Sequence, residues 1–150
     1  MIVNTPQQTF RAALGQFFVK ETSTENLAAA RSLIERSETA GADLLVLPEC
    51  IIARKLGMPD WGQKHAEPLD GPFVSGLREA TRGRRVTVVC TVQAKIANES
   101  RYANDLLVIQ NGELRLTYQK IHLYDAFRGK ESSYAAPGDV LPQVLQIGPF

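Results

Sequence analysis

Two side chains capable of amide chemistry stand where strands are expected to end. Glu49 follows the mainly apolar residues 43–47 and ends the motif LLVLPE, and Lys120 follows a predicted hairpin in the motif YQKIHL. A carboxylate can accept and return a proton, and a lysine cation can stabilise the oxyanion that forms when a nucleophile attacks a carbonyl group. Each residue alone has a simpler interpretation: Glu49 as a carboxylate at a helix N-terminus, and Lys120 as a solvated residue closing a strand.

An amide hydrolase that uses a thiol also needs a cysteine nucleophile. Cys50 follows Glu49 directly, but in an extended chain its side chain would point away from Glu49, which separates thiol from base. Its position near a strand-to-helix turn is the argument in its favour. Cys90 lies within the β-branched residues 86–92, where a cysteine is normally a packed apolar side chain. We therefore expect neither cysteine to be the nucleophile.

A β-α-β unit is expected to position Glu49. Residues 11–18 predict a strand, and the T-x-x-E spacing of Thr22 and Glu25 is typical of a capping box that begins a helix. Gly41 is expected to end this helix, and residues 43–47 predict a buried strand. The carboxylate would then lie at the carboxyl edge of a sheet, where α/β proteins usually bind ligands.

The next segment predicts a loop, a helix and a strand. Residues 55–72 are rich in glycine, proline and polar side chains, and they indicate a long loop that contains the single tryptophan, Trp61. Residues from Phe73 onward have helical spacing, and residues 86–92 are typical of a strand covered on both faces. Trp61 and, later in the chain, Tyr124 and Phe127 are expected either to line a substrate pocket or to anchor the loops.

A β-hairpin is expected over residues 102–118. Asn111 and Gly112 stand between its two strands, and this dipeptide accepts the positive φ angles that a type I′ turn requires. A charged and aromatic segment follows, with a turn at Pro137 and Gly138, and the apolar residues 144–147 predict a last strand. Because a turn pattern then follows with no partner strand after it, we expect the sequence to be part of a larger domain.

Composition excludes several functional classes. The 150 residues carry a net charge of +1 and are 44% hydrophobic, with no basic or acidic segment of the kind that binds nucleic acid. No apolar stretch approaches the roughly 20 residues of a membrane helix, so we expect a cytoplasmic protein without a membrane partner. The two cysteines and two histidines have no zinc-binding spacing, and we predict no metal or other cofactor.

Three segments together resemble the nitrilase superfamily of carbon-nitrogen hydrolases. They are LLVLPE with Glu49, YQKIHLYDAF with Lys120, and the glutamate that follows, Glu131. The similarity is greatest to the branch called deaminated glutathione amidases, which also have the early A-x-G-Q-F pattern present at residues 13–17. The resemblance extends in order and spacing over nearly the whole chain.

The resemblance implies an α/β fold, the four-layer α-β-β-α sandwich, of which residues 1–150 would form the amino-terminal part and about half. It implies that Glu49 is the catalytic base and acid, that Lys120 holds the oxyanion, and that Glu131 steadies the lysine. The cysteine nucleophile would lie beyond Phe150. The implied partner is a small-molecule amide, such as deaminated glutathione or a related ω-amide, and the full-length form would be a homodimer.

The sequence allows two other interpretations. A catalytically inactive binding or subunit protein derived from the same family would keep the pocket without the nucleophile. A flavodoxin-like nucleotide-binding module would require a glycine-rich loop after the first strand, and the sequence has none there. We therefore expect an amidase, and we expect this chain alone to be inactive.

Overall fold

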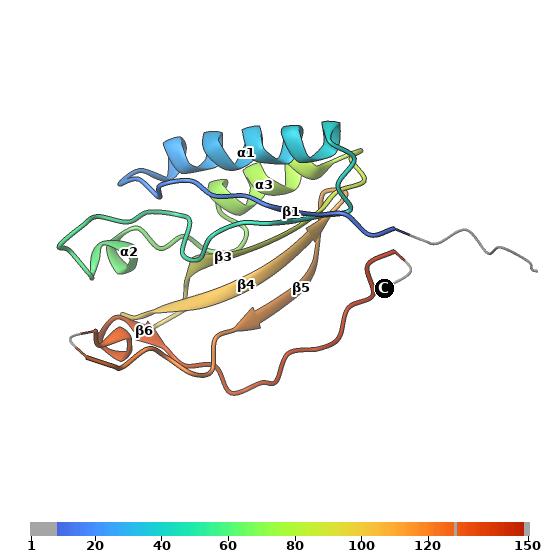
Figure 1. The fold of residues 1–150 in the computed structure, drawn as a ribbon. Helices are drawn as coiled ribbons and strands as arrows, with labels where there is room; N and C mark the ends of the chain where they lie inside the picture. The colour runs from blue at the N-terminus through green and yellow to red at the C-terminus, as the bar shows by residue number, and fades with distance from the viewer. Residues whose placement is uncertain (1–8, 128, 149–150) are drawn as a thin grey trace, which may run out of the picture.

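The computed structural model describes residues 9–127 and 129–148, and it consists of one sheet with helices on one face (Figure 1). In chain order the elements are β1 (Ala12–Leu14), α1 (Ser23–Thr39), β2 (Leu44–Val46), α2 (Trp61–Lys64), α3 (Pro72–Thr81), β3 (Thr87–Lys95), β4 (Tyr102–Gln110), β5 (Glu113–Gln119), the 3-10 turn η1 (Glu131–Ser133) and β6 (Ala135–Ala136).

The sheet is mixed. Its order is β1-β2-β3-β4-β5, in which β1, β2 and β3 run parallel, β3, β4 and β5 run antiparallel, and β6 pairs parallel with the start of β4. Helices α1 and α3 cover one face, and the segment after β5 passes along the other side (Figure 1). The predicted α/β class is confirmed, and one helical layer on one sheet corresponds to half of an α-β-β-α sandwich.

The β-α-β unit forms as predicted, with shorter strands. Thr22 caps α1 by accepting a hydrogen bond from the backbone N–H of Glu25 at 3.5 Å, and Gly41 follows the helix with a φ of 68°. The strand expected over residues 11–18 has only the three residues of β1, because the chain leaves the sheet after Gly15, whose N–H still donates to Val46. The exposed side chain of Phe18 agrees with this early departure.

The hairpin prediction is confirmed. The two turn residues, Asn111 and Gly112, have φ angles of 48° and 79°, as a type I′ turn requires. The strand expected over residues 86–92 is also present but continues to Lys95, because β3 pairs with β4 along its full length. This extension places Gln93 inside the sheet, close to the segment that follows β2.

The prediction of a long loop holds in part, and the prediction of a last strand is wrong. The long loop predicted over residues 55–72 contains the helical turn α2 and a bridge from Glu67 to Ala94 of β3. The apolar residues 144–147 do not form a strand; Val144 is fully exposed, and no described strand pairs with this segment. The short strand β6 was not predicted, because two alanines have no alternating pattern of their own.

The core lies between the sheet and the two helices above it. Its largest fully buried side chains include Phe73 and Leu77 of α3, Ile34 of α1, Leu45 of β2 and Leu107 of β4. These contacts fix the strands against both helices, so the ends of β2 and β5 are held at one edge of a rigid sheet. Across the described ranges, no helix is both long and apolar enough to span a membrane.

Candidate active site

Side chains of β3 hold the turn that follows β2. The backbone N–H of Cys50 donates to the hydroxyl of Thr91 at 2.8 Å, and the N–H of Ile52 donates to the amide oxygen of Gln93 at 3.0 Å. The amide nitrogen of Gln93 donates in turn to the carbonyl groups of Cys50 and Ala53, at 3.0 and 2.9 Å. Since Gln93 is buried, these contacts fix the path of the chain around Glu49.

Cys50 lies on the same side as Glu49, which corrects the sequence-based expectation. The prediction assumed an extended chain, but Cys50 has a φ of 53°, and this left-handed conformation brings both residues to the wall of one cavity. Burial, followed by the negative charge of Glu49, raises the pKa of the Cys50 thiol to about 12. The thiol is therefore protonated at neutral pH and is a poor nucleophile in this environment.

The backbone of Lys120 is held from two sides. Its N–H donates to the carbonyl of Asn104 in β4 at 2.9 Å, and its carbonyl accepts from the N–H of Gly138 at 2.9 Å. Residue 138 approaches β5 so closely that an added Cβ would lie 2.5 Å from the carbonyl oxygen of Gln119. Glycine is thus required at the predicted turn, where it fixes the position of the lysine.

Glu131 is buried and binds Lys120 directly. One of its carboxylate oxygens accepts from the ammonium group of Lys120 at 2.9 Å and from the backbone N–H of Tyr124 at 2.6 Å. The other oxygen accepts from the side-chain amide of Asn104 at 3.2 Å. Burial raises the pKa of Glu131, but these three donors outweigh burial and lower the pKa below its usual value.

Lys120 remains a cation because of its two acidic neighbours. Partial burial lowers the pKa of Lys120, but the hydrogen bond and the charge of Glu131, followed by the charge of Glu49, raise it above its usual value. A lysine held in this charged form can stabilise an anion at a fixed position, whereas a neutral amine could not.

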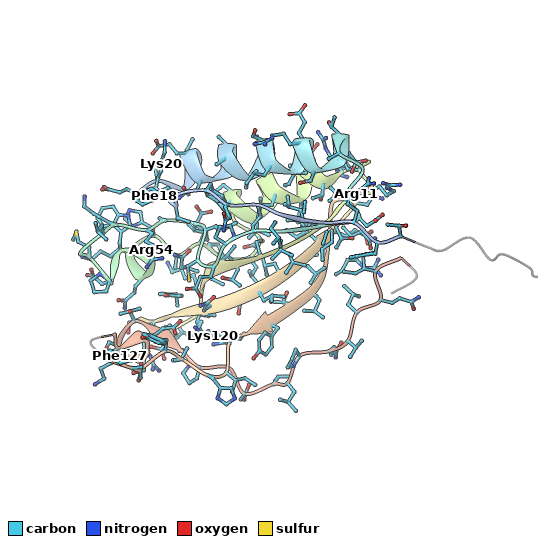
Figure 2. All side chains as sticks on the ribbon, in the orientation of Figure 1. Arg11, Phe18, Lys20, Arg54, Lys120 and Phe127 are labelled. Atoms are coloured by element: carbon cyan, nitrogen blue, oxygen red, sulfur yellow. The ribbon has the colours of Figure 1, made fainter. Side chains whose placement is uncertain are left out.

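The three predicted residues line one cavity of about 440 Å³. Lys120 and Glu131 are in contact, and Glu49 is an exposed side chain whose charge acts on Lys120. In Figure 2, the loop that contains Arg54 lies above one end of the sheet, and Lys120 lies below the same end. The geometry thus unites a lysine cation, a carboxylate without a hydrogen-bond donor in the described chain, and a buried carboxylate that fixes the lysine. The catalytic roles of the three residues remain predictions.

Several residues of the cavity were not predicted from the sequence. Arg54, Tyr102 and Tyr134 line it together with Gln93. A glutamine within an otherwise apolar strand is a visible signal, since such an amide needs buried partners, but the partners themselves are distant in sequence. Trp61 both lines the cavity and anchors the loop, because its indole N–H donates a hydrogen bond to the backbone carbonyl of Glu21.

Tyr124 and Phe127 were expected either to line a pocket or to anchor a loop. Tyr124 lines the cavity, whereas Phe127 is fully exposed in this chain. No group of three or more acidic, histidine or cysteine side chains suited to a metal ion exists within residues 9–127 and 129–148. The cavity walls carry carboxylates, cations and phenols, together with the thiol of Cys50.

Comparison with known proteins agrees with this geometry. The chain is 31% identical over 135 residues to a deaminated glutathione amidase of Escherichia coli O157:H7. This alignment covers 90% of the chain and 51% of the relative. It is 27% identical over 139 residues to an omega-amidase of Xenopus tropicalis, which covers 87% of this chain and 48% of the relative. The chain thus spans about half the length of these curated relatives.

Structural similarity leads to the same group of proteins. The crystal structure of an amidase from Nesterenkonia sp. superimposes with a TM-score of 0.75 at 25% identity, covering 91% of this chain and 51% of the amidase. Residues 11–150 match the model of the carbon-nitrogen hydrolase family. The match includes the whole cavity with Glu49, Lys120 and Glu131, and the chain belongs to the carbon-nitrogen hydrolase family.

Proposed function

We propose that this protein is an amidase that cleaves a small non-peptide amide, with deaminated glutathione or a related ω-amide of a dicarboxylic acid as the substrate. One observation carries the proposal: Lys120, fixed by Glu131 at 2.9 Å, lines the same cavity as Glu49, whose carboxylate has no hydrogen-bond partner among the described residues. The names of the curated relatives, a deaminated glutathione amidase and an omega-amidase, support the substrate class.

The residues divide the reaction between them. A thiol attacks the amide carbon, and Glu49 takes the thiol proton as general base. The resulting oxyanion is stabilised by Lys120, which stays charged because of Glu131. Glu49 then returns the proton to the amine, the carbon-nitrogen bond breaks, and ammonia leaves. Water attacks the thioester with help from the same carboxylate, which releases the carboxylic acid and regenerates the thiol.

The thiol is proposed to come from a cysteine outside these 150 residues. Burial raises the pKa values of both Cys50 and Cys90 to about 12, so neither thiol is prepared for attack. We also propose, on the resemblance alone, that the protein acts as a homodimer in the cytoplasm. Glu131 is a positioning residue in this scheme, since its carboxylate accepts hydrogen bonds, within the described residues, from Lys120, Asn104 and the backbone N–H of Tyr124.

The test is ammonia release from ω-amides by the protein expressed from its own gene. Glu49→Gln removes the base and Lys120→Met removes the oxyanion partner, and each is expected to lower kcat/KM by about a hundred- to ten-thousand-fold. Glu79→Gln is a matched control, because Glu79 is an exposed carboxylate paired with Arg82 on α3. Turnover that survives in both active-site variants, or no ammonia release by the unaltered protein, would contradict the proposal.

A further inference from the structure

Arg54 is the cation of the cavity that lacks an acidic partner. Its backbone N–H donates to Lys20 at 2.9 Å, which fixes the residue at the cavity wall. Its guanidinium group forms no hydrogen bond or ion pair with any residue in the described part of the chain. The positive charge nevertheless acts inside the cavity, because it lowers the pKa of Tyr134, whose net rise is due first to burial.

The adjacent cation, Lys55, is already occupied. Its ammonium group pairs with Glu21 at 2.7 Å and lies 4.8 Å from the ring centre of Trp61. Lys55 thus ties the loop to the segment before α1, although it also borders the cavity. The two neighbouring cations differ in this respect: one is used by the fold, and the other is available to a ligand.

The remaining charges of the cavity also leave Arg54 uncompensated. Lys120 is compensated by Glu131 at 2.9 Å, and Glu49 acts on Lys120 as a second negative neighbour. An arginine presents two parallel N–H donors, which match the two oxygens of a carboxylate. Arg54 and Lys120 line the same cavity, whose volume of about 440 Å³ has room for a small dicarboxylic acid monoamide.

We propose that Arg54 is the specificity-determining residue that binds the free carboxylate of the substrate, while the amide end lies at Glu49 and Lys120. This inference rests on the proposed function, which it deepens by assigning the carboxylate of the ω-amide to a residue. The same arrangement favours a carboxylate over a neutral amide of equal length, because the neutral amide offers no anion to the exposed guanidinium group of Arg54.

The experiment compares glutaramate, the monoamide of glutaric acid, with pentanamide, a neutral amide of the same chain length. Both are titrated into the protein expressed from its own gene, by calorimetry for binding and by ammonia release for turnover. Arg54→Gln is expected to weaken glutaramate binding and kcat/KM by about ten- to a hundred-fold, with less than about a two-fold effect on pentanamide. Lys55→Gln, the matched control, is expected to leave the preference for glutaramate unchanged.

Each outcome decides between the two proposals. Equal losses for both amides in Arg54→Gln, or an equal loss of preference in Lys55→Gln, would overturn the role of Arg54 while amidase activity remains. Glutaramate binding that depends on Arg54 without any ammonia release would support this role and overturn the proposed reaction. Failure of the unaltered protein to bind glutaramate more tightly than pentanamide would overturn the assignment of the carboxylate to Arg54.

Discussion

Two polar clusters lie at opposite ends of the sheet, and they differ in how far their charged groups are already used. Figure 2 places Arg11 at one end, and Arg54 and Lys120 at the other. We call the first cluster the basal network, which comprises Arg11, Glu38, Asp43 and Arg85. The second is the cavity described above. The contrast separates charges that hold the fold from charges that are available for chemistry.

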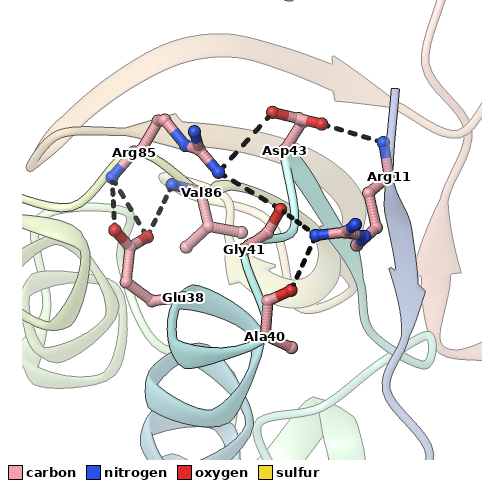
Figure 3. A network of polar contacts seen from close by, with 7 residues as sticks. All are labelled: Arg11, Glu38, Ala40, Gly41, Asp43, Arg85 and Val86. Atoms are coloured by element: carbon pink, nitrogen blue, oxygen red, sulfur yellow. Dashed lines mark hydrogen bonds and ion pairs between the residues drawn. The ribbon is translucent and has the colours of Figure 1, made fainter. Parts of the chain in front are cut away.

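The basal network satisfies its members internally (Figure 3). The guanidinium of Arg11 donates to the carbonyl of Ala40 at 2.9 Å, and that of Arg85 donates to the carbonyl of Gly41 at 3.2 Å, so both close the C-terminal end of α1. The carboxylate of Glu38 accepts from the backbone N–H groups of Arg85 and Val86, at 3.1 and 2.9 Å. The network therefore joins a helix end to the starts of the parallel strands.

The cavity keeps part of its hydrogen-bonding capacity unused. Within the described residues, the carboxylate of Glu49 and the guanidinium of Arg54 form no hydrogen bond, whereas Glu131 binds three donors. Groups that keep free donors and acceptors at a sheet edge can bind a ligand without first breaking internal contacts. The difference supports the prediction that the functional site lies at the carboxyl ends of β2 and β5, and variants of either cluster can test this prediction.

Glu131→Gln is expected to have the largest effect among changes to residues that support the cavity. It removes the negative charge that raises the pKa of Lys120, so that pKa falls and the alkaline limb of the pH-rate profile moves to lower pH. We expect kcat/KM to fall by about ten- to a hundred-fold and stability to fall by about 1 kcal/mol. Ammonia release across pH, together with urea denaturation, measures both.

Glu99→Gln is the matched control for that change, because Glu99 is also paired with a cation, Arg101, but lies outside the cavity that contains Lys120. It is expected to leave the pH-rate profile in place. A loss of activity in Glu131→Gln without any movement of the alkaline limb would show that Glu131 does not act through Lys120.

Glu38→Ala tests the basal network and should give the opposite result. It leaves the N–H groups of Arg85 and Val86 without their acceptor, which is expected to destabilise the protein by about 2 kcal/mol. Well below the unfolding temperature, kcat/KM should change by less than about two-fold. Glu35→Ala, an exposed glutamate on the same helix, is the control for helix propensity. Lost activity in a folded Glu38→Ala protein would refute the separation of the two clusters.

Local patterns predicted the elements well, because their causes are local. The Thr22 cap and the Asn111-Gly112 turn depend on residues that are close in sequence, and both formed as expected. The positions of Glu49 and Lys120 at strand ends followed from those elements. The contact between Lys120 and Glu131, eleven residues apart, was expected from the resemblance and not from periodicity.

Long-range contacts explain what the sequence could not reveal. Cys50 adopts a left-handed conformation because Thr91 and Gln93, more than forty residues later, bind its backbone. Nothing in the residues next to 49 and 50 therefore indicated that the chain is not extended there. Arg54 was missed for a related reason, since its importance depends on the absence of an ion pair that its neighbour Lys55 does form.

Asp105 belongs to neither cluster, and it shows how a buried carboxylate without a partner lowers the stability of the folded state. It lies on β4 between Val92 and Gln119, is 6% exposed, and forms no side-chain hydrogen bond or ion pair with the described residues. Burial raises its pKa from the usual 3.8 to about 6. The folded state thus favours the protonated form of Asp105. The contribution of this protonated side chain to the free energy of unfolding is greatest below about pH 3.8, and it is lost as the pH rises through about 6.

Asp105→Asn should therefore stabilise the protein at high pH and change little at low pH. Asparagine stays neutral throughout, so the variant is expected to gain about 1 to 2 kcal/mol over the unaltered protein at about pH 8 and nothing measurable near pH 3. Urea denaturation at both pH values measures the difference, with the exposed Asp70→Asn as control. An equal gain at the two pH values would assign the effect to packing, whereas a loss at pH 8 would mean that the carboxylate has a partner, as the charges of the basal network do.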